Sequence, residues 1–356
     1  MTVIVTGGAG FIGSALVRQL NTLGISVVTI DKLTYAANPD NLANLARPDL
    51  HRLHQVDICD APSVRRIFAE ARPSAIYHLA AESHVDRSID DPVPFVRTNV
   101  EGSAVLLTAT RDYCAGLDAT ARGQFRFLQV STDEVYGELG ASGAFDENSP
   151  YRPNSPYAAS KAAADHFARA FARTYDLPVL LTNCGNNYGP RQFPEKLIPL
   201  TILNAVTGKR LPVYGAGRQV RDWIHVDDHA AALRAVVARG RPRETYLVGA
   251  RGEMRNIDIV QKVCALLDAV RPRPDGRSYA EQIEFVTDRP GHDERYAIDP
   301  RKIESEIGWH AETAVDRGLR ETVQWYLDNP AFCARSEVSY DRRRIGLISD
   351  DREKRA

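Results

Sequence analysis

The chain has 356 residues, of which 44% are hydrophobic and 26% are charged, and its formal net charge at pH 7 is −1. This composition permits a large core and excludes a disordered chain, and the low net charge argues against nucleic acid or a membrane surface as the main partner. No apolar stretch is long enough to span a membrane, no secretory leader follows Met1, and the five scattered cysteines contain no Cys-x-x-Cys pair, which together predict a cytoplasmic protein with reduced thiols and no metal site.

The first predicted element is a strand at 3–6, and it runs into a glycine-rich turn followed by helical spacing. Gly8, Gly10 and Gly13 form a G-x-G-x-x-G motif between this strand and the helix, where the backbone can approach a pyrophosphate. A second strand, expected at 26–30, ends at Asp31, whose carboxylate can bind ribose hydroxyls and would repel a 2′-phosphate. The sequence therefore predicts a dinucleotide site that prefers NAD to NADP, although the neighbouring Lys32 weakens this preference.

Further strands are expected at 51–56 and 75–79, each preceded by a helical or loop segment. This alternation predicts an α/β protein with a Rossmann-type, doubly wound parallel sheet and a smaller mixed α/β lobe for the substrate. Of the polar residues that follow the second strand, His84 is interpreted as a hydrogen-bonded loop histidine in preference to a catalytic one. Helix is expected over most of 90–110, and a polar loop is expected at 115–124.

The stretch 125–137 combines an apolar strand with an abruptly polar end at Thr132, Asp133 and Glu134. Ligands of open α/β sheets bind beyond the carboxyl ends of the strands. Two adjacent carboxyl groups in a partly dry site should have pKa values that differ, so that one serves as an acid and the other as a base. Taken alone, the stretch is equally consistent with a surface turn bearing two solvated acids.

Tyr157 and Lys161 lie one turn apart at the start of a long helical pattern that extends to Tyr175. An ammonium group beside a phenol stabilises the phenolate and makes tyrosine a usable base. The pair is common by chance, but its position after a dinucleotide motif and after the polar strand end makes it specific.

These motifs resemble the extended short-chain dehydrogenase/reductases. Within that superfamily the chain is similar to the dTDP-glucose 4,6-dehydratase family over about residues 2–330, and the similarity is carried by the stretches 79–88, 131–137, 182–190, 193–199 and 288–292. The family usually carries serine where this chain has Gly185, which adjoins the expected pocket.

The resemblance implies which residues bind each ligand, with Thr132, Asp133, Glu134, Tyr157 and Lys161 as the catalytic set. Cofactor contacts are expected at Gly7, Gly10, Phe11, Ile12, Gly13, Asp31, Lys32, Leu33, Thr34, Asp57, Ile58, Leu79, Ala80, Ala81, Glu82, Thr98, Tyr157, Lys161 and Asn187. Substrate contacts are expected at Ser83, Thr132, Asn186, Lys196, Leu197, Pro212, Val213, Tyr214, Arg221, Asn256, Asp288, Arg289 and His292. The cations among them suit a diphosphate, and the tyrosine ring suits a stacked base.

The expected reaction is an NAD-dependent dehydration of dTDP-glucose to dTDP-4-keto-6-deoxy-glucose. Tyr157 takes the C4 hydroxyl proton as hydride passes to NAD+, Glu134 removes the C5 proton, Asp133 protonates the leaving C6 hydroxyl, and hydride returns to C6. A 4,6-dehydratase for UDP-glucose or a GDP-sugar remains an alternative. A sugar-nucleotide 4-epimerase needs no acid–base pair for elimination, and a catalytically silent NAD-sensing module would need neither Tyr157 nor Lys161.

The predicted organisation is an NAD-binding domain at 1–185, to which later segments return, a sugar-nucleotide lobe at 186–335 and a charged extension at 336–356. A homodimer is expected, because the helical segments 90–110 and 157–175 are more apolar than one domain requires and such helices pair across a two-fold axis in the family.

Overall fold

The computed structural model describes residues 1–339 and Gly346, and its centre is a seven-stranded sheet. The strands of this sheet are β1 (Thr2–Thr6), β2 (Ser26–Asp31), β3 (His51–Gln55), β4 (Ala75–His78), β5 (Arg126–Thr132), β6 (Val179–Cys184) and β10 (Thr245–Val248). Their order is β10-β6-β5-β4-β1-β2-β3, and every neighbouring pair is parallel. The doubly wound parallel sheet predicted from the sequence is therefore confirmed.

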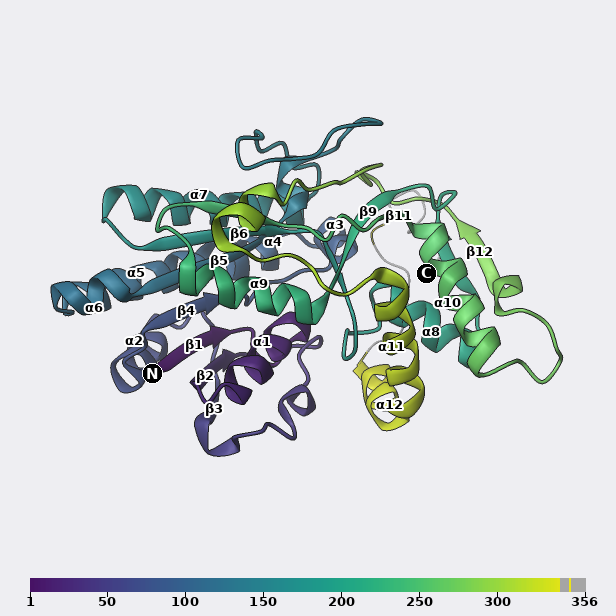
Figure 1. Ribbon diagram of the computed structural model, residues 1–356, viewed down its shortest axis with the longest axis horizontal. Coiled ribbons are helices and arrows are strands. Elements are labelled where there is room, and N and C mark those ends of the chain that lie inside the picture. The colour runs from purple at the N-terminus through teal and green to yellow at the C-terminus, as the bar shows by residue number, and fades with distance from the viewer. Residues whose placement is uncertain (340–345, 347–356) are drawn as a thin grey trace.

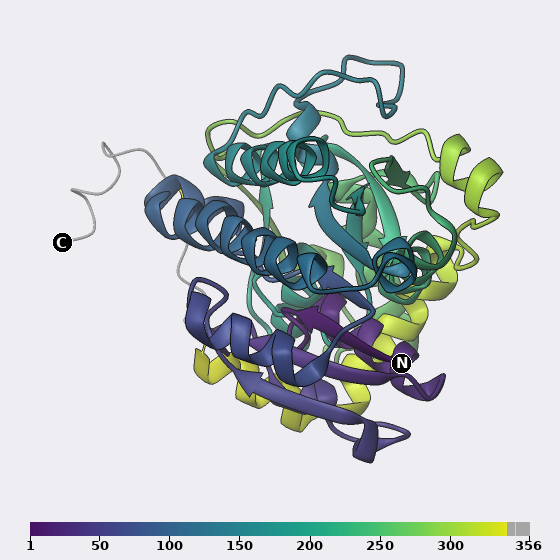
Figure 2. The ribbon, with the colours of Figure 1, turned by 90° about the vertical axis from the view of Figure 1, so that its left-hand side faces the viewer.

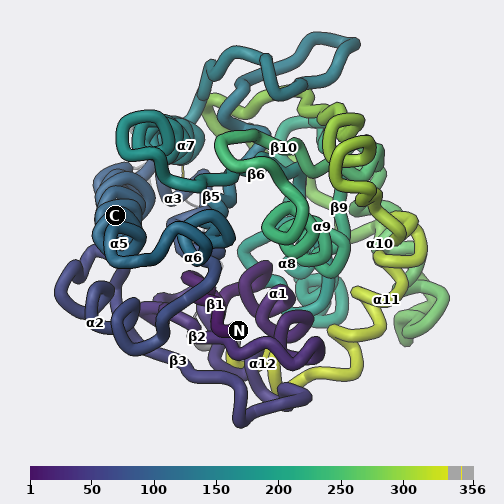
Figure 3. Tube along the Cα trace, turned by 60° about the vertical axis from the view of Figure 1, so that its left-hand side comes forward, coloured from purple at the N-terminus to yellow at the C-terminus, as the bar shows by residue number. Residues whose placement is uncertain are grey.

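Helices cover both faces of this sheet (Figures 1 and 3). They are α1 (Phe11–Thr22), α2 (Ala61–Ala71), α5 (Gly102–Ala115), α7 (Pro156–Thr174) and α9 (Val226–Arg239). Helices α1 and α9 pack on one face, while α2, α5 and α7 pack on the other, where α5 and α7 run side by side (Figure 2). A strand covered on both faces must be apolar throughout, and Val3, Ile4 and Val5 of β1 are accordingly all fully buried.

The strand order reverses between β1 and β4, and this reversal places two loops side by side. Thr6 at the end of β1 is in register with His78 at the end of β4. The glycine turn that follows β1 and the loop that begins at Leu79 therefore leave the sheet at the same point. In open α/β sheets such a reversal is where ligands bind.

The segment between β4 and β5 contains more helix than the sequence indicated. It holds α3 (Val85–Asp90), α4 (Val93–Phe95), a π-helical turn η3 (Val96–Glu101) and then α5. The loop predicted at 115–124 is wrong over its second half, because α6 (Ala119–Gln124) forms there. The side chain of Asp118 accepts a hydrogen bond from the Ala121 N–H and caps this helix.

Most of the remaining helices and strands form a second lobe, which lies at the right of Figure 1. It contains a sheet of order β11-β9-β7 and a two-stranded sheet of β12 and β8. Its elements are β7 (Asn186–Tyr188), α8 (Leu197–Val206), β8 (Leu211–Tyr214), β9 (Val220–His225), β11 (Glu253–Arg255), α10 (Asn256–Val270), β12 (Ile283–Val286), α11 (Val315–Asp328) and α12 (Pro330–Ser339). Short helical turns occur in both parts of the molecule. They are η1 (Pro39–Leu42), η2 (Pro48–Leu50), η4 (Asp133–Tyr136), η5 (Tyr279–Gln282) and η6 (Ile303–Ile307).

The predicted extension at 336–356 lies outside the described residues beyond Ser339, apart from Gly346. Within the described part of the chain, none of the helices combines the length and apolar character that crossing a bilayer requires.

Candidate active site

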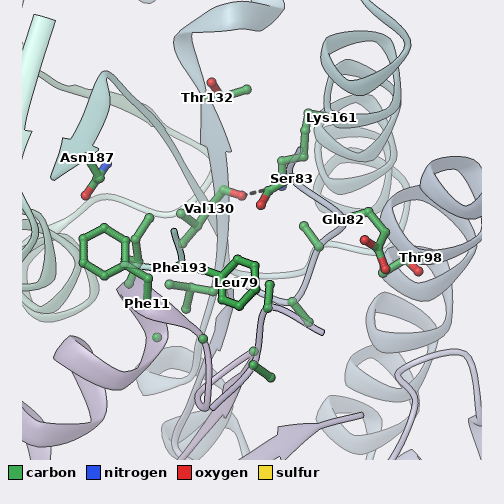
Figure 4. A pocket seen from close by; sticks show the side chains of 18 of the residues that line it. Phe11, Leu79, Glu82, Ser83, Thr98, Val130, Thr132, Lys161, Asn187 and Phe193 are labelled. Atoms are coloured by element: carbon green, nitrogen blue, oxygen red, sulfur yellow. Dashed lines mark hydrogen bonds between the residues drawn. The ribbon is translucent and has the colours of Figure 1, made fainter. Parts of the chain in front are cut away.

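A cavity of about 310 Å³ opens where β1, β4, β5 and β6 end (Figure 4). Most of the predicted site residues line it together. These are Gly7, Gly10, Phe11, Ile12, Gly13, Asp31, Lys32, Thr34, Ile58, Leu79, Ala80, Ala81, Glu82, Ser83, Thr98, Thr132, Asp133, Glu134, Tyr157, Lys161, Asn186, Asn187 and Lys196. The cavity thus joins the glycine turn of the large sheet to the start of the second lobe.

The glycine turn has the backbone geometry of a dinucleotide site. Gly7 has φ +70°, and a Cβ atom there would lie 2.8 Å from the backbone nitrogen of Ala80. A Cβ atom on Gly13 would collide with the carbonyl group of Gly7. Only glycine fits at both positions, and the bare backbone of this turn can approach a pyrophosphate closely. The residues present therefore fit a bound dinucleotide.

Asp31 is held by the backbone at the end of β2. Its two carboxylate oxygens accept hydrogen bonds from Ala9 N, at 3.0 Å, and from Leu33 N, at 2.8 Å. Burial raises the pKa of Asp31, and these two donors and the charge of Lys32 oppose that rise. The carboxylate is thus oriented before any ligand arrives.

Lys32 lies close to three other residues expected to contact the cofactor. Its ammonium nitrogen donates to Thr98 Oγ1 at 3.2 Å and lies 3.8 Å from carboxylate oxygens of both Asp57 and Glu82. Asp57 does not line the cavity but reaches the site through this cluster. The structure therefore brings four residues from separate loops and helices together.

Tyr157 and Lys161 project from the first turns of α7, which Ser155 caps by accepting from Ala158 N. Both side chains are buried, and Lys161 Nζ donates to the carbonyl oxygen of Val130 at 2.7 Å (Figure 4). Burial and the charge of Glu134 raise the pKa of Tyr157, whereas a hydrogen bond with Thr132 lowers it. The tyrosine therefore requires cationic support to act as a base.

The three polar residues at the end of β5 form one compact unit. Thr132 accepts a hydrogen bond from Glu134 N at 3.3 Å and donates one to Asp133 Oδ1 at 3.2 Å. Burial and the charge of Glu134 raise the pKa of Asp133 well above its ordinary value. Burial also raises the pKa of Glu134, but the charges of Arg289 and Arg221 oppose this rise. This difference favours Asp133 as a proton donor and Glu134 as a proton acceptor.

Eleven predicted contacts are not part of the cavity lining. They are Leu33, Asp57, Leu197, Pro212, Val213, Tyr214, Arg221, Asn256, Asp288, Arg289 and His292. Most belong to the second lobe, where the side chain of Val213 is buried in the core of the lobe.

Several of these second-lobe residues form a polar network next to the carboxylates. Arg289 Nη1 donates to Asp86 Oδ1 at 2.8 Å, and the Tyr214 hydroxyl donates to Asp86 Oδ2 at 2.6 Å. His292 Nδ1 lies 2.6 Å from Asp288 Oδ1. Because Arg289 also lowers the pKa of Glu134, this network adjoins the catalytic set.

Sequence reasoning missed several residues of the site. The cavity is also lined by Ala36, Ala37, Val56, Val130, Ser131, Cys184, Gln192, Phe193 and Glu195. Gly185 lines it as well, in keeping with its expected position beside the pocket. Asp86, Phe193 and Glu195 fall within stretches that resemble the family, so a signal for them was present. His84 caps α3 by accepting from Arg87 N, and burial lowers the pKa of His84 to about 3. Its interpretation as a hydrogen-bonded histidine therefore agrees with the structure.

Comparison with known proteins places this site in a family. A family model described as GDP-mannose 4,6 dehydratase matches residues 4–322. The dTDP-glucose 4,6-dehydratase of Xanthomonas campestris pv. campestris (strain B100) is 54% identical over 346 residues, which cover 97% of this chain and 99% of the relative.

Two solved structures that contain NAD have folds similar to that of this chain. DesIV, a dTDP-glucose 4,6-dehydratase from Streptomyces venezuelae with NAD and TYD bound, has a TM-score of 0.84 and 44% identity, covering 93% of this chain and 98% of its own. The UDP-glucose 4-epimerase of Thermus thermophilus, in complex with NAD, has a TM-score of 0.80 and 30% identity, covering 92% of this chain and 99% of its own. Since identity is much higher to the dehydratases across nearly the whole length, the chain belongs to the dTDP-glucose 4,6-dehydratase family of the extended short-chain dehydrogenase/reductases.

Proposed function

We propose that the protein is a hydro-lyase that dehydrates dTDP-glucose to dTDP-4-keto-6-deoxy-glucose with NAD as its cofactor. One observation carries this proposal: Asp133 and Glu134 share a cavity with both the Tyr157–Lys161 pair and the glycine turn. An elimination needs an acid and a base in addition to the groups that support hydride transfer. The name and bound NAD of DesIV support the same substrate and cofactor.

Each residue of the catalytic set has a role that its surroundings favour. NAD, when bound, would accept hydride from C4 of the sugar and return it to C6. Tyr157, supported by the charge of Lys161, removes the proton of the C4 hydroxyl, and Thr132 hydrogen-bonds that oxygen. The C4 ketone acidifies the C5 proton, which Glu134 removes. As hydride returns to C6, Glu134 gives a proton, exchanged with solvent, back to C5. Asp133, whose pKa burial raises, is protonated and supplies the proton that leaves with the C6 hydroxyl as water.

The alternatives differ in what they leave unexplained. A 4-epimerase would use the glycine turn and Tyr157 but not a proton donor at Asp133. The structural likeness to an epimerase at 30% identity reflects the shared fold. A dehydratase for another nucleotide sugar would use the same catalytic set, and a panel of dTDP-, UDP- and GDP-glucose separates it from the proposal by relative kcat/KM.

The decisive experiment follows the label at C4 of the sugar. Substrate with deuterium at C4, mixed with unlabelled substrate, should give product with deuterium at C6 of the same molecule and a solvent-derived hydrogen at C5. An epimerase would return the label to C4, and a simple dehydrogenase would release it. Label that is absent from C6 or scrambled between molecules contradicts the proposal.

We also propose that the protein is a cytoplasmic homodimer with its NAD-binding part in residues 1–185 and its sugar-nucleotide lobe mainly in 186–335. Val93 of α4, Val96 of η3 and Phe167 of α7 are apolar but exposed at 69%, 57% and 41%. These elements are neighbours on one side of the large sheet. An exposed apolar surface of this kind supports pairing with a second copy of the chain.

A further inference from the structure

Helix α7 carries a third ionisable side chain on the face that holds the catalytic pair. Tyr157, Lys161 and Asp165 are spaced four residues apart, so they lie above one another along the helix. Asp165 is fully buried and does not itself line the cavity. We propose that Asp165 is a positioning residue that keeps Lys161 in its charged form, an inference that rests on the proposed role of the Tyr157–Lys161 pair.

The carboxylate of Asp165 is held by hydrogen bonds on one oxygen only. Its Oδ2 accepts from the Ser131 hydroxyl at 2.7 Å, the Tyr151 hydroxyl at 2.9 Å and Asn183 Nδ2 at 3.4 Å. Its Oδ1 is buried and has no hydrogen-bond partner among the described residues. Three neutral donors fix the carboxylate in place, but they leave its charge without a direct counter-ion. A buried carboxylate in this situation needs a nearby cation.

The buried ammonium group of Lys161 likewise has no direct counter-ion among the described residues. It donates to a neutral acceptor, the carbonyl oxygen of Val130. Burial lowers the pKa of Lys161, and Asp165 is the strongest group opposing that fall. Burial in turn raises the pKa of Asp165, and Lys161 is the strongest group opposing that rise. The two buried charges therefore stabilise each other electrostatically through the low-dielectric interior, without a direct ion pair.

The other ionisable groups around the pair do not replace this interaction. Cys184 on β6 and His78 on β4 face Lys161, but burial raises the pKa of the thiol to about 12 and lowers that of the imidazole to about 3, so both are neutral. Arg169, one turn beyond Asp165, donates to the Tyr151 hydroxyl at 2.9 Å and adds a second positive charge on that side. Asp165 is thus the negative charge that offsets the burial of the ammonium.

Neutralising Asp165 should lower the pKa of Lys161. Without the charge of Asp165, burial of Lys161 is opposed less, so its pKa falls and the ammonium is lost at a lower pH. Tyr157 then loses its cationic neighbour, and the C4 proton is removed more slowly. We therefore expect the alkaline limb of the pH–rate profile to move to lower pH when Asp165 is neutralised.

The test measures the titration of Lys161 itself in the NAD-loaded protein. The chain contains seven lysines, so the 13Cε signals of labelled lysine can be followed by NMR and Lys161 assigned from the signal lost in Lys161→Arg. Asp165→Asn should lower the midpoint of Lys161 by about one pH unit and move the alkaline limb of turnover in the same direction. Tyr151→Phe, which removes the hydrogen bonds of this hydroxyl with Asp165, Arg169 and Asn183 but no charge, is the matched control and should leave the midpoint unchanged.

An unchanged midpoint in Asp165→Asn, or an equal shift in Tyr151→Phe, overturns the inference. Should Asp165→Asn fail to fold, Asp165→Glu carries the test, because it retains the charge. The inference then expects a midpoint close to that of the wild type even where stability is reduced, and a fall of about one unit contradicts it. The NMR midpoint does not depend on which nucleotide sugar is the substrate, so failure of this inference is distinguishable from failure of the proposed function.

Discussion

Replacing Asp86 with alanine should weaken the connection between the two lobes. Asp86 lies on α3 beside the large sheet, whereas its partners Arg289 and Tyr214 belong to the second lobe. The side chains of Asp86 and Arg289 are only 7% and 15% exposed. In Asp86→Ala, Arg289 Nη1 loses its acceptor, and Arg289 Nε is already buried without one among the described residues. Arg289 Nε and Nη1 would then both lack an acceptor among the described residues.

The magnitude follows from the type of interaction removed. Breaking a buried ion pair by removing one partner costs about 3–5 kcal/mol, because the remaining charge is uncompensated. Arg289 still faces Glu134, so we expect a loss near the lower end of this range. Tyr214→Phe removes one hydrogen bond to a charged group and should cost about 1.5 kcal/mol. The free energy of unfolding should thus fall roughly twice as far in the first variant as in the second.

Urea unfolding followed by circular dichroism measures these losses, and a double-mutant cycle isolates the pair. Asp86→Ala, Arg289→Met and the double variant should show an interaction energy of about 2 kcal/mol. Additivity to within about 0.5 kcal/mol would refute the reasoning. Because Arg289 and Tyr214 are proposed substrate contacts, the KM of Asp86→Ala for dTDP-glucose should rise more than its kcat falls.

The pH dependence of this stability has a definite sign. Burial raises the pKa of Asp86, but the charge of Arg289 and the hydrogen bonds outweigh burial and leave the pKa below its ordinary value of 3.8. A carboxyl group whose pKa is lowered by folding contributes stability above its unfolded pKa and loses it as the pH falls. The difference between the wild type and Asp86→Ala should therefore shrink below about pH 4.

Three further predictions concern chemistry, cofactor choice and assembly. Glu134→Gln should allow C4 oxidation but not C5 proton removal, so reduced nicotinamide should accumulate on mixing with substrate. A native turnover rate in this variant would contradict the assigned base. Asp133→Asn should slow the loss of water while the C5 hydrogen exchanges with solvent. The purified protein should release NAD on denaturation, and Asp31→Asn should bind NADP about tenfold more tightly than the wild type by calorimetry, because the carboxylate no longer repels the 2′-phosphate. Val96→Lys should convert a dimer to a monomer in sedimentation at micromolar concentration, whereas a monomeric wild type would exclude the dimer.

The fold was predictable wherever burial leaves a periodic pattern in the sequence. Inner strands of the large sheet such as β1 and β2 are buried on both faces, and their sequences contain short, continuous apolar runs. Helix α6 was missed because none of its residues is buried, so no apolar periodicity marks it. Its helical state depends on the cap from Asp118, which is a local hydrogen bond and not a pattern of hydrophobic residues.

The residues proposed as catalytic could be grouped from the sequence because they occur as close neighbours along the chain. Tyr157 and Lys161 share one helix face, and Asp133 and Glu134 are consecutive. The Asp86–Arg289 pair joins residues 203 positions apart, and no local pattern links them. Asp165 is visible in the sequence as an acid one turn beyond Lys161, but the three donors that fix it come from β5, β6 and the loop before α7, which only the packed structure reveals.

The packing around Gly185 gives a physical reason why this chain has glycine where the family usually carries serine. A Cβ atom at this position would lie 2.6 Å from the carbonyl oxygen of Asp222, a backbone atom of β9. The Asp222 carboxylate accepts from Gly252 N at 2.7 Å and Ala250 N at 3.2 Å, so β9 is held where it is. A serine at 185 would require β9 to lie farther from the end of β6, and β9 also carries Arg221, which lowers the pKa of Glu134. The glycine therefore sets the distance between a cation of the second lobe and the base of the proposed elimination.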